Sequence, residues 1–121
     1  MKETFGGFVK QKRIVKNISL RTFADVIGVS PEYLSKIENN LRTAPKDIVI
    51  EKIANKLSLC NEEKEILLDL AAKSKSNLSL ASDLMIYINE NEMVHKTLRI
   101  AKRKSLSNEE WQEIFNLISK K

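Results

Sequence analysis

The chain has 121 residues, a formal net charge of +5 at pH 7 and 42% hydrophobic residues, with three Gly and two Pro. We therefore expect an ordered globular protein of one domain, with or without an appendage, that can form a hydrophobic core without disulfides or metals. No apolar run approaches the ~20 residues of a membrane-spanning helix, and the first ten residues lack the apolar core of a signal peptide, so we expect a cytoplasmic protein.

The first predicted helix covers residues 3–16, because aromatic residues and Val9 recur there at helical spacing. Gly costs about 1 kcal/mol relative to Ala inside a helix. Gly6 and Gly7 therefore move the expected start of this helix towards Gly7 or Phe8.

Residues 20–27 form the second predicted helix. Ser19 precedes it as a favourable N-cap. Ala24 is small enough to let another helix approach closely, and Gly28 is expected to end the helix in the left-handed conformation that Gly adopts without steric cost.

The third predicted helix begins at Pro31, because a serine N-cap precedes it and Pro is tolerated at the first helical position. Leu34 and Ile37 are expected to point inward. The chain should leave this helix at Asn39 and Asn40, since Asn tolerates left-handed geometry. A basic loop follows.

Apolar stripes predict two further helices over about residues 46–58 and 62–74, the second capped by Asn61 and carrying Ile66 on its apolar stripe. A polar connector covers residues 74–79. Together with the three helices before them, these helices form an expected N-terminal domain, residues 1–76.

Residues 77–121 are predicted to form an extension of about three helices. Two are short apolar-periodic segments, and the third begins with a capping box between Ser107 and Glu110. Trp111 and three apolar residues after it recur at helical spacing, as expected of a core or an interface. With no strand-type alternation, the chain is predicted to be all-α.

Cys60 is the only cysteine and His95 the only histidine, so the chain has neither an intrachain disulfide nor a metal-ligand signature. We expect Cys60 to be a small buried residue. The sequence has no convergent catalytic set and no phosphate-binding loop. We therefore expect no enzymatic activity, no cofactor and no metal.

The positive charge is unevenly distributed. Residues 1–46 carry nine Lys/Arg and four Asp/Glu, whereas residues 47–76 carry five and six, and residues 77–121 carry seven and six. An excess in one segment is expected if that segment meets a polyanion. A basic solvated surface is the alternative, and charge alone does not decide between them.

Residues 19–45 read SLRTFADVIGVSPEYLSKIENNLRTAP, with the patterns F-A-x-x-I-G-V-S and L-S-K-I-E-N. This stretch resembles the phage repressor/Cro-type (XRE-like) helix-turn-helix proteins, and a weaker resemblance extends from about Phe5 to Ala72. The resemblance implies a five-helix repressor-like DNA-binding domain whose third helix enters the major groove of double-stranded DNA.

The resemblance also implies which residues contact DNA. Contacts to base edges are expected from Glu32, Tyr33, Ser35 and Lys36. The chemistry agrees, because Glu can accept from cytosine N4 and Lys can donate to guanine O6 and N7. Pro31 occupies a base-reading position too, but it offers only apolar contact.

Contacts to phosphates are expected from Ser19, Arg21, Asn39, Arg42 and Lys46. Many relatives carry Gln where Leu20 stands, and Leu cannot make the corresponding hydrogen bond. Arg13 and Glu38 match a pair that forms a structural ion pair in relatives.

The sequence thus predicts a transcription regulator, in particular a repressor that binds a palindromic operator as a homodimer. The alternative is an antitoxin-type protein that neutralises a toxin and regulates its own operon. The two hypotheses differ in what residues 77–121 contact, which is a second copy of the chain or a protein partner such as a toxin or another regulator.

Overall fold

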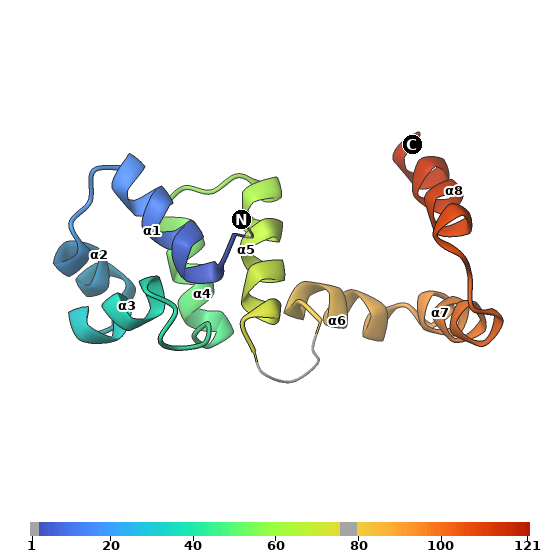
Figure 1. The fold of residues 1–121 in the computed structure, drawn as a ribbon, viewed down its shortest axis with the longest axis horizontal. Helices are drawn as coiled ribbons and strands as arrows, with labels where there is room; N and C mark the ends of the chain where they lie inside the picture. The colour runs from blue at the N-terminus through green and yellow to red at the C-terminus, as the bar shows by residue number, and fades with distance from the viewer. Residues whose placement is uncertain (1–2, 76–79) are drawn as a thin grey trace. The chain divides into compact units, whose positions relative to one another are not determined.

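The computed structural model describes residues 3–75 and 80–121, and this part of the chain contains eight helices and no strand (Figure 1). The helices are α1 (Phe5–Val15), α2 (Leu20–Ile27), α3 (Pro31–Glu38), α4 (Asp47–Lys56), α5 (Asn61–Lys73), α6 (Ser82–Glu90), α7 (Glu92–Lys104) and α8 (Asn108–Ser119). The predicted all-α class is confirmed. None of the described helices is long and apolar enough to cross a membrane.

The chain forms two compact units, one ending at Met85 and the other beginning at Ile86. The predicted boundary between residues 76 and 77 lies outside the described residues, as does most of the predicted connector 74–79.

The first unit is built around α3, which packs against α1 and α2, while α2 also contacts α4, and α5 contacts both α1 and α4. The largest fully buried side chains are Phe23, Ile27, Leu34, Ile37, Ile53, Leu57, Leu67 and Val9. Leu34 and Ile37 thus point inward as predicted. Because α3 gives this one face to the core, its other face remains at the surface.

The helix ends follow local chemistry. The hydroxyl groups of Thr4, Ser19 and Ser30 each accept a hydrogen bond from the backbone N–H three residues later. At the other end of α3, Asn40 is left-handed with φ 61°, and the N–H of Leu41 donates to the carbonyl of Lys36 at 2.8 Å. The predicted caps of α2 and α3, and the exit from α3, are confirmed.

The expected start of the first helix was wrong. α1 begins at Phe5, so both Gly6 and Gly7 lie inside it. Gly6 is buried, and a Cβ placed on it would lie only 2.1 Å from the carbonyl oxygen of Ile37. Gly6 lowers the helix propensity of α1, but a larger residue would not fit, because α1 lies so close to the end of α3 at this point.

Three expectations about α5 and its start were also wrong. Cys60 is exposed and is the N-cap of α5, a position predicted for Asn61, which is the first helical residue. The backbone N–H of Cys60 donates to Glu63 Oε1 at 3.1 Å, which holds the helix start one residue earlier. Ile66, predicted to be on the buried stripe, is 45% exposed.

The second unit has almost no interior. Of residues 86–121, only Ala101 is buried, and α7 and α8 make little contact along their lengths. The predicted start of α8 is confirmed, because Ser107 and Glu110 exchange hydrogen bonds of 3.0 and 3.2 Å. The helices are therefore well defined locally, but their apolar stripes are not covered.

Candidate nucleic-acid interface

The joint between α2 and α3 fixes the angle between the two helices. Gly28 is left-handed with φ 80°, and the N–H of Val29 donates to the carbonyl of Ala24 at 3.0 Å. Ala24 is fully buried, so no large side chain holds the two helices apart. This arrangement turns the chain sharply and presents α3 at the surface of the unit.

The outer face of α3 carries the four residues predicted to contact bases. Glu32 and Lys36 are exposed, whereas Tyr33 and Ser35 are partly buried. The structure brings three of the four together around one shallow hollow, which is lined by Leu20, Pro31, Glu32, Ser35 and Lys36. Tyr33 does not line this hollow, because its ring packs partly against the core.

Ser19 is the N-cap of α2 and is exposed. Its hydroxyl accepts from the N–H of Thr22 at 3.1 Å and donates to the hydroxyl of Thr22 at 2.8 Å. The side chain is thus already occupied in capping. The N–H groups of Leu20 and Arg21 lie in the first turn, where helical carbonyls are not available, so a phosphate at this end would be bound by the backbone.

The remaining predicted phosphate contacts lie after α3. Asn39 is the C-cap of the helix, and its Nδ2 donates to the carbonyl of Ser35 at 2.9 Å. Arg42 lies in the loop that follows, and Lys46 is the N-cap residue of α4; both are exposed. Arg42 and Lys46 therefore leave their positive charge in solvent, next to the end of α3.

The cations of α1 and those around α3 differ in whether a carboxylate pairs with them. Lys12 and Arg13 of α1 form ion pairs with Glu63 and Glu38. Among the described residues, in contrast, no carboxylate forms an ion pair with the cations at the start of α2, on α3 or in the loop after it, namely Arg21, Lys36, Arg42 and Lys46. The positive charge around α3 is therefore available to an external anion.

Arg13 and Glu38 hold α3 in place. The Arg13 guanidinium donates to both carboxylate oxygens of Glu38, at 2.8 and 3.0 Å, and to the carbonyl of Ile18 at 2.8 Å. Both side chains are buried. One guanidinium thus connects α1, the turn before α2 and the last residue of α3.

Comparison with known families identifies this region. The model of the family described as Helix-turn-helix matches residues 9–63, which include all of α2, α3 and the residues around them. Residues 9–63 contain a helix-turn-helix domain. The resemblance noted in the sequence is therefore confirmed for this part of the chain.

Two relatives of this helix-turn-helix domain are named transcriptional regulators. The HTH-type transcriptional regulator SinR of Bacillus licheniformis is 40% identical over 65 residues, which are 50% of this chain and 59% of that protein. SinR of Bacillus subtilis (strain 168) is 43% identical over 49 residues, 40% of this chain and 44% of that protein. The chain thus spans about half the length of these relatives.

A solved structure is similar over nearly the whole chain. It is titled SinR protein/SinI protein complex, with a TM-score of 0.50, 27% sequence identity, and coverage of 96% of this chain and 95% of that chain. The likeness extends beyond the helix-turn-helix domain into α6, α7 and α8.

The hollow beside α3 could not be predicted from the sequence. The sequence contains one trace of it, which is Leu20, an apolar residue at the first position of α2. Only the structure shows that Leu20 and Pro31, each the first residue of its helix, line the same hollow.

Proposed function

We propose that this chain is a cytoplasmic transcription regulator that inserts α3 into the major groove of double-stranded DNA. The observation that carries the proposal is the contrast in charge pairing. Arg13 is paired with Glu38 in the interior and Lys12 with Glu63 at a partly exposed position, whereas the cations around α3 (Arg21, Lys36, Arg42 and Lys46) form no ion pair among the described residues. Unpaired cations on one face favour a polyanionic ligand.

The residue roles follow from where the side chains lie. Glu32, Ser35 and Lys36 on the outer face of α3 contact base edges, and Tyr33 contributes from the half-buried side of the helix. Phosphate contacts lie at the two ends of the α2–α3 pair, and the residues proposed for them are Ser19, Arg21, Asn39, Arg42 and Lys46. Phosphates at both ends would fix the register of α3 in the groove.

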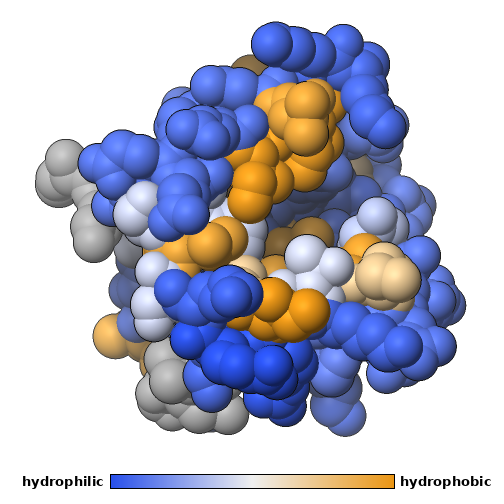
Figure 2. Space-filling model, turned by 90° about the vertical axis from the view of Figure 1, so that its right-hand side faces the viewer, coloured by the Kyte–Doolittle hydropathy of each residue, from blue (hydrophilic) through white to orange (hydrophobic). Residues whose placement is uncertain are grey.

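We propose further that residues 77–121 join two copies of the chain. Large hydrophobic side chains are exposed along α6, α7 and α8, including Ile86, Tyr87, Leu98, Ile100, Trp111, Ile114, Phe115, Leu117 and Ile118. Figure 2 looks onto the side of Figure 1 where α7 and α8 lie, and hydrophobic side chains reach the surface there. Exposed apolar surface of this kind marks an interface.

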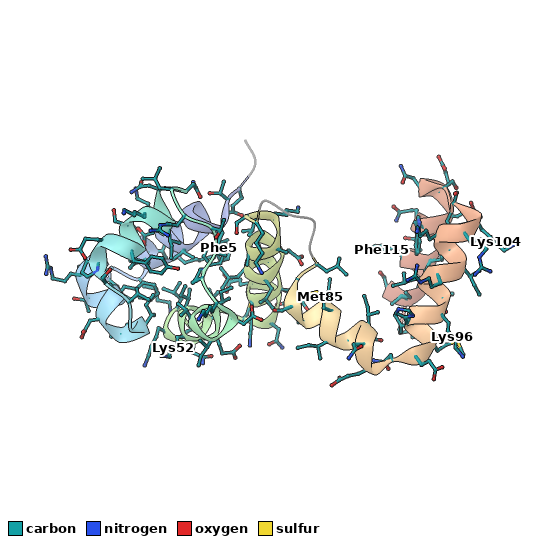
Figure 3. The ribbon with its side chains drawn as sticks, turned by 90° about the horizontal axis from the view of Figure 1, so that it is seen from below. Phe5, Lys52, Met85, Lys96, Lys104 and Phe115 are labelled. Atoms are coloured by element: carbon teal, nitrogen blue, oxygen red, sulfur yellow. The ribbon has the colours of Figure 1, made fainter. Side chains whose placement is uncertain are left out.

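Charge favours a second copy as the occupant of this surface. Helix α7 carries five Lys/Arg and one Glu, whereas α8 carries three Glu and no Lys or Arg. In Figure 3, Lys104 of α7 and Phe115 of α8 lie on different sides of the unit. A two-fold axis would place the basic α7 of one copy near the acidic α8 of the other, so the surface is complementary to itself.

A protein partner of different sequence is the second candidate for this surface. The similar solved structure is, by its title, a complex of SinR with a second protein, SinI. A partner helix that covers the same apolar stripes would compete with the second copy. Such a partner would be another regulator that opposes dimerisation. If this chain is an antitoxin-type protein, the partner would be its toxin.

Selection of bound DNA from a random pool tests the DNA-binding proposal directly. We expect enrichment of an inverted repeat whose half-sites lie about one helical turn apart, because a two-fold dimer binds two equivalent half-sites. Repression follows where such a site overlaps a promoter. Failure to enrich any sequence at low salt would contradict the proposal.

Sedimentation analysis tests the dimer. We expect the intact chain to be a dimer and Phe115→Glu to be a monomer, because a charge is placed in the apolar stripe of α8. Gln112→Glu is the matched control, since it adds the same charge to the same helix at another exposed position and should leave the dimer intact. A monomeric intact chain would contradict the proposal.

A further inference from the structure

The hollow beside α3 has a distinct chemical composition. Leu20 from α2 and Pro31 from α3 contribute apolar side chains to it, and polar groups come from Glu32, Ser35 and Lys36. Leu20 is only partly exposed because it packs against the core. The apolar part of the hollow is therefore held in place before any ligand arrives.

A phosphate is a poor occupant for this hollow. Glu32 and Lys36 both line it, so the hollow has no net positive charge with which to hold a phosphate. A small-molecule ligand is also disfavoured, because such ligands are largely enclosed in deep clefts whereas this hollow is shallow and open to solvent. An uncharged apolar group of a base edge satisfies both constraints.

The major groove exposes one apolar group on the base edges, which is the C5-methyl of thymine. The side chain of Leu20 and the ring of Pro31 have no hydrogen-bond donor or acceptor. This part of the surface therefore cannot distinguish bases through hydrogen bonds. It can distinguish them only by burying, or failing to bury, a methyl group.

We propose that Leu20 and Pro31 together recognise one thymine in each half-site through its C5-methyl. Leu20 is thereby a specificity-determining residue. The inference rests on the proposed function, because it requires α3 in the major groove. Lys36 lines the same hollow and would contact a guanine at an adjacent base pair.

The test replaces thymine by uracil, which removes only the methyl group. Each thymine of the selected operator is changed to deoxyuridine in turn, and the Kd of the full-length protein is measured by fluorescence anisotropy. We expect one position per half-site at which uracil weakens binding about three- to fivefold, the loss that corresponds to one buried methyl group. The other thymines should change little.

Variants assign that loss to Leu20. Leu20→Ala should lose most of the preference for thymine over uracil, because Pro31 alone covers less of the methyl group, whereas Leu20→Met, which stays apolar, should keep it. Val26→Ala is the control, because Val26 is an exposed apolar residue of the same helix that does not line the hollow. It should keep the full preference. The thermal unfolding of each variant is measured alongside.

The outcomes separate this inference from the proposed function. An operator that binds equally well with every thymine replaced would overturn the methyl contact while leaving DNA binding established. An undiminished preference for thymine in Leu20→Ala would also overturn it, because the methyl group would then be bound elsewhere. Failure to select any DNA would contradict the proposed function itself.

Discussion

Arg13 in α1 and Glu38 at the end of α3 form a buried ion pair with two parallel hydrogen bonds, of 2.8 Å from Nε to Oε2 and 3.0 Å from Nη2 to Oε1. The residues are only 9% and 5% exposed. The third contact of the guanidinium, with the carbonyl of Ile18, extends this connection to the turn before α2. The position of α3 thus depends on a residue that is not in the helix-turn-helix itself.

Removing one member of this pair should be costly. Glu38→Ala is expected to lower the free energy of unfolding by about 3 kcal/mol, because it leaves a buried guanidinium without its partner. The double variant Arg13→Met, Glu38→Leu should lose less than Glu38→Ala, since no charge is left buried. Urea unfolding of the single and double variants measures both. A double variant as unstable as the sum of the two single variants would contradict this explanation.

Gly6 and Gly7 are adjacent in α1 but should respond in opposite ways to the same change. Gly6→Ala is expected to destabilise the protein by about 2 kcal/mol, because the new Cβ would clash with the carbonyl oxygen of Ile37, which cannot move freely. Gly7→Ala meets only the side chain of Thr4 and should gain up to about 1 kcal/mol from helix propensity. Thermal unfolding of the two variants measures the difference, and equal effects would refute the close approach of α1 and α3.

The ion pair between Lys12 and Glu63 should make stability depend on pH. The hydrogen bond from Lys12, at 2.6 Å, and that from the backbone of Cys60 lower the pKa of Glu63 from 4.5 to about 2. Since the folded state holds the carboxylate ionised, this contribution is present above pH 4.5 and is lost as the pH falls towards 2. Lys12→Met should therefore raise the pKa of Glu63.

NMR titration of the Glu63 carboxyl group measures this shift directly. Because both side chains are partly exposed, added salt should weaken the pair. Lys64 and Glu51 form a more exposed pair, and Lys64→Met serves as the control that should leave the pKa of Glu63 low. A Glu63 pKa that is unchanged in Lys12→Met would contradict the assignment.

Lys36→Ala and Arg42→Ala should change different properties of DNA binding. Lys36→Ala is expected to cost roughly 1–3 kcal/mol in operator binding and to relax base choice at one position. Arg42→Ala should weaken binding to all sequences and reduce the salt dependence by about one unit of slope, as for the loss of one phosphate contact. Titrations at several salt concentrations with specific and unrelated DNA distinguish the two. Loss of specific binding alone in Arg42→Ala would exclude a phosphate role.

The helix-turn-helix could be predicted from the sequence because its signals are local. Ser19 and Ser30 cap their own helices, and Gly28 provides its own left-handed conformation. The capping box of Ser107 and Glu110 is equally local. Each of these features depends on residues within a few positions along the chain, so periodicity and capping rules were sufficient.

Features that depend on distant contacts could not be predicted in this way. The burial of Gly6 depends on Ile37, which lies far along the chain. The N-cap at Cys60 was missed for a different reason: its contact with Glu63 is local, but Cys is not among the usual N-cap residues, whereas Asn, the residue at position 61, is. Ser58 and Ser105 adopt left-handed conformations at helix ends, with φ 52° and 50°. Serine, unlike Gly or Asn, does not favour this conformation, so its sequence position does not predict it.

The apolar stripe of α8 shows a further limit. Trp111, Ile114, Phe115 and Ile118 recur at helical spacing, a pattern that is the same whether the stripe faces an internal core or another chain. The structure leaves each of them at least 37% exposed. Periodicity thus identifies which face is apolar but not which surface covers it.

Because residues beyond Met85 are almost all unburied, the folding of this segment is expected to be coupled to the association of two chains. With Ala101 as their only buried residue, residues 86–121 gain little stability from their own contacts. In the proposed dimer, their folding and the association of two chains would therefore be one equilibrium, whose midpoint depends on how much protein is present. Dilution would unfold α7 and α8 before the first unit. The occupancy of an operator that binds only dimers would rise steeply with protein concentration.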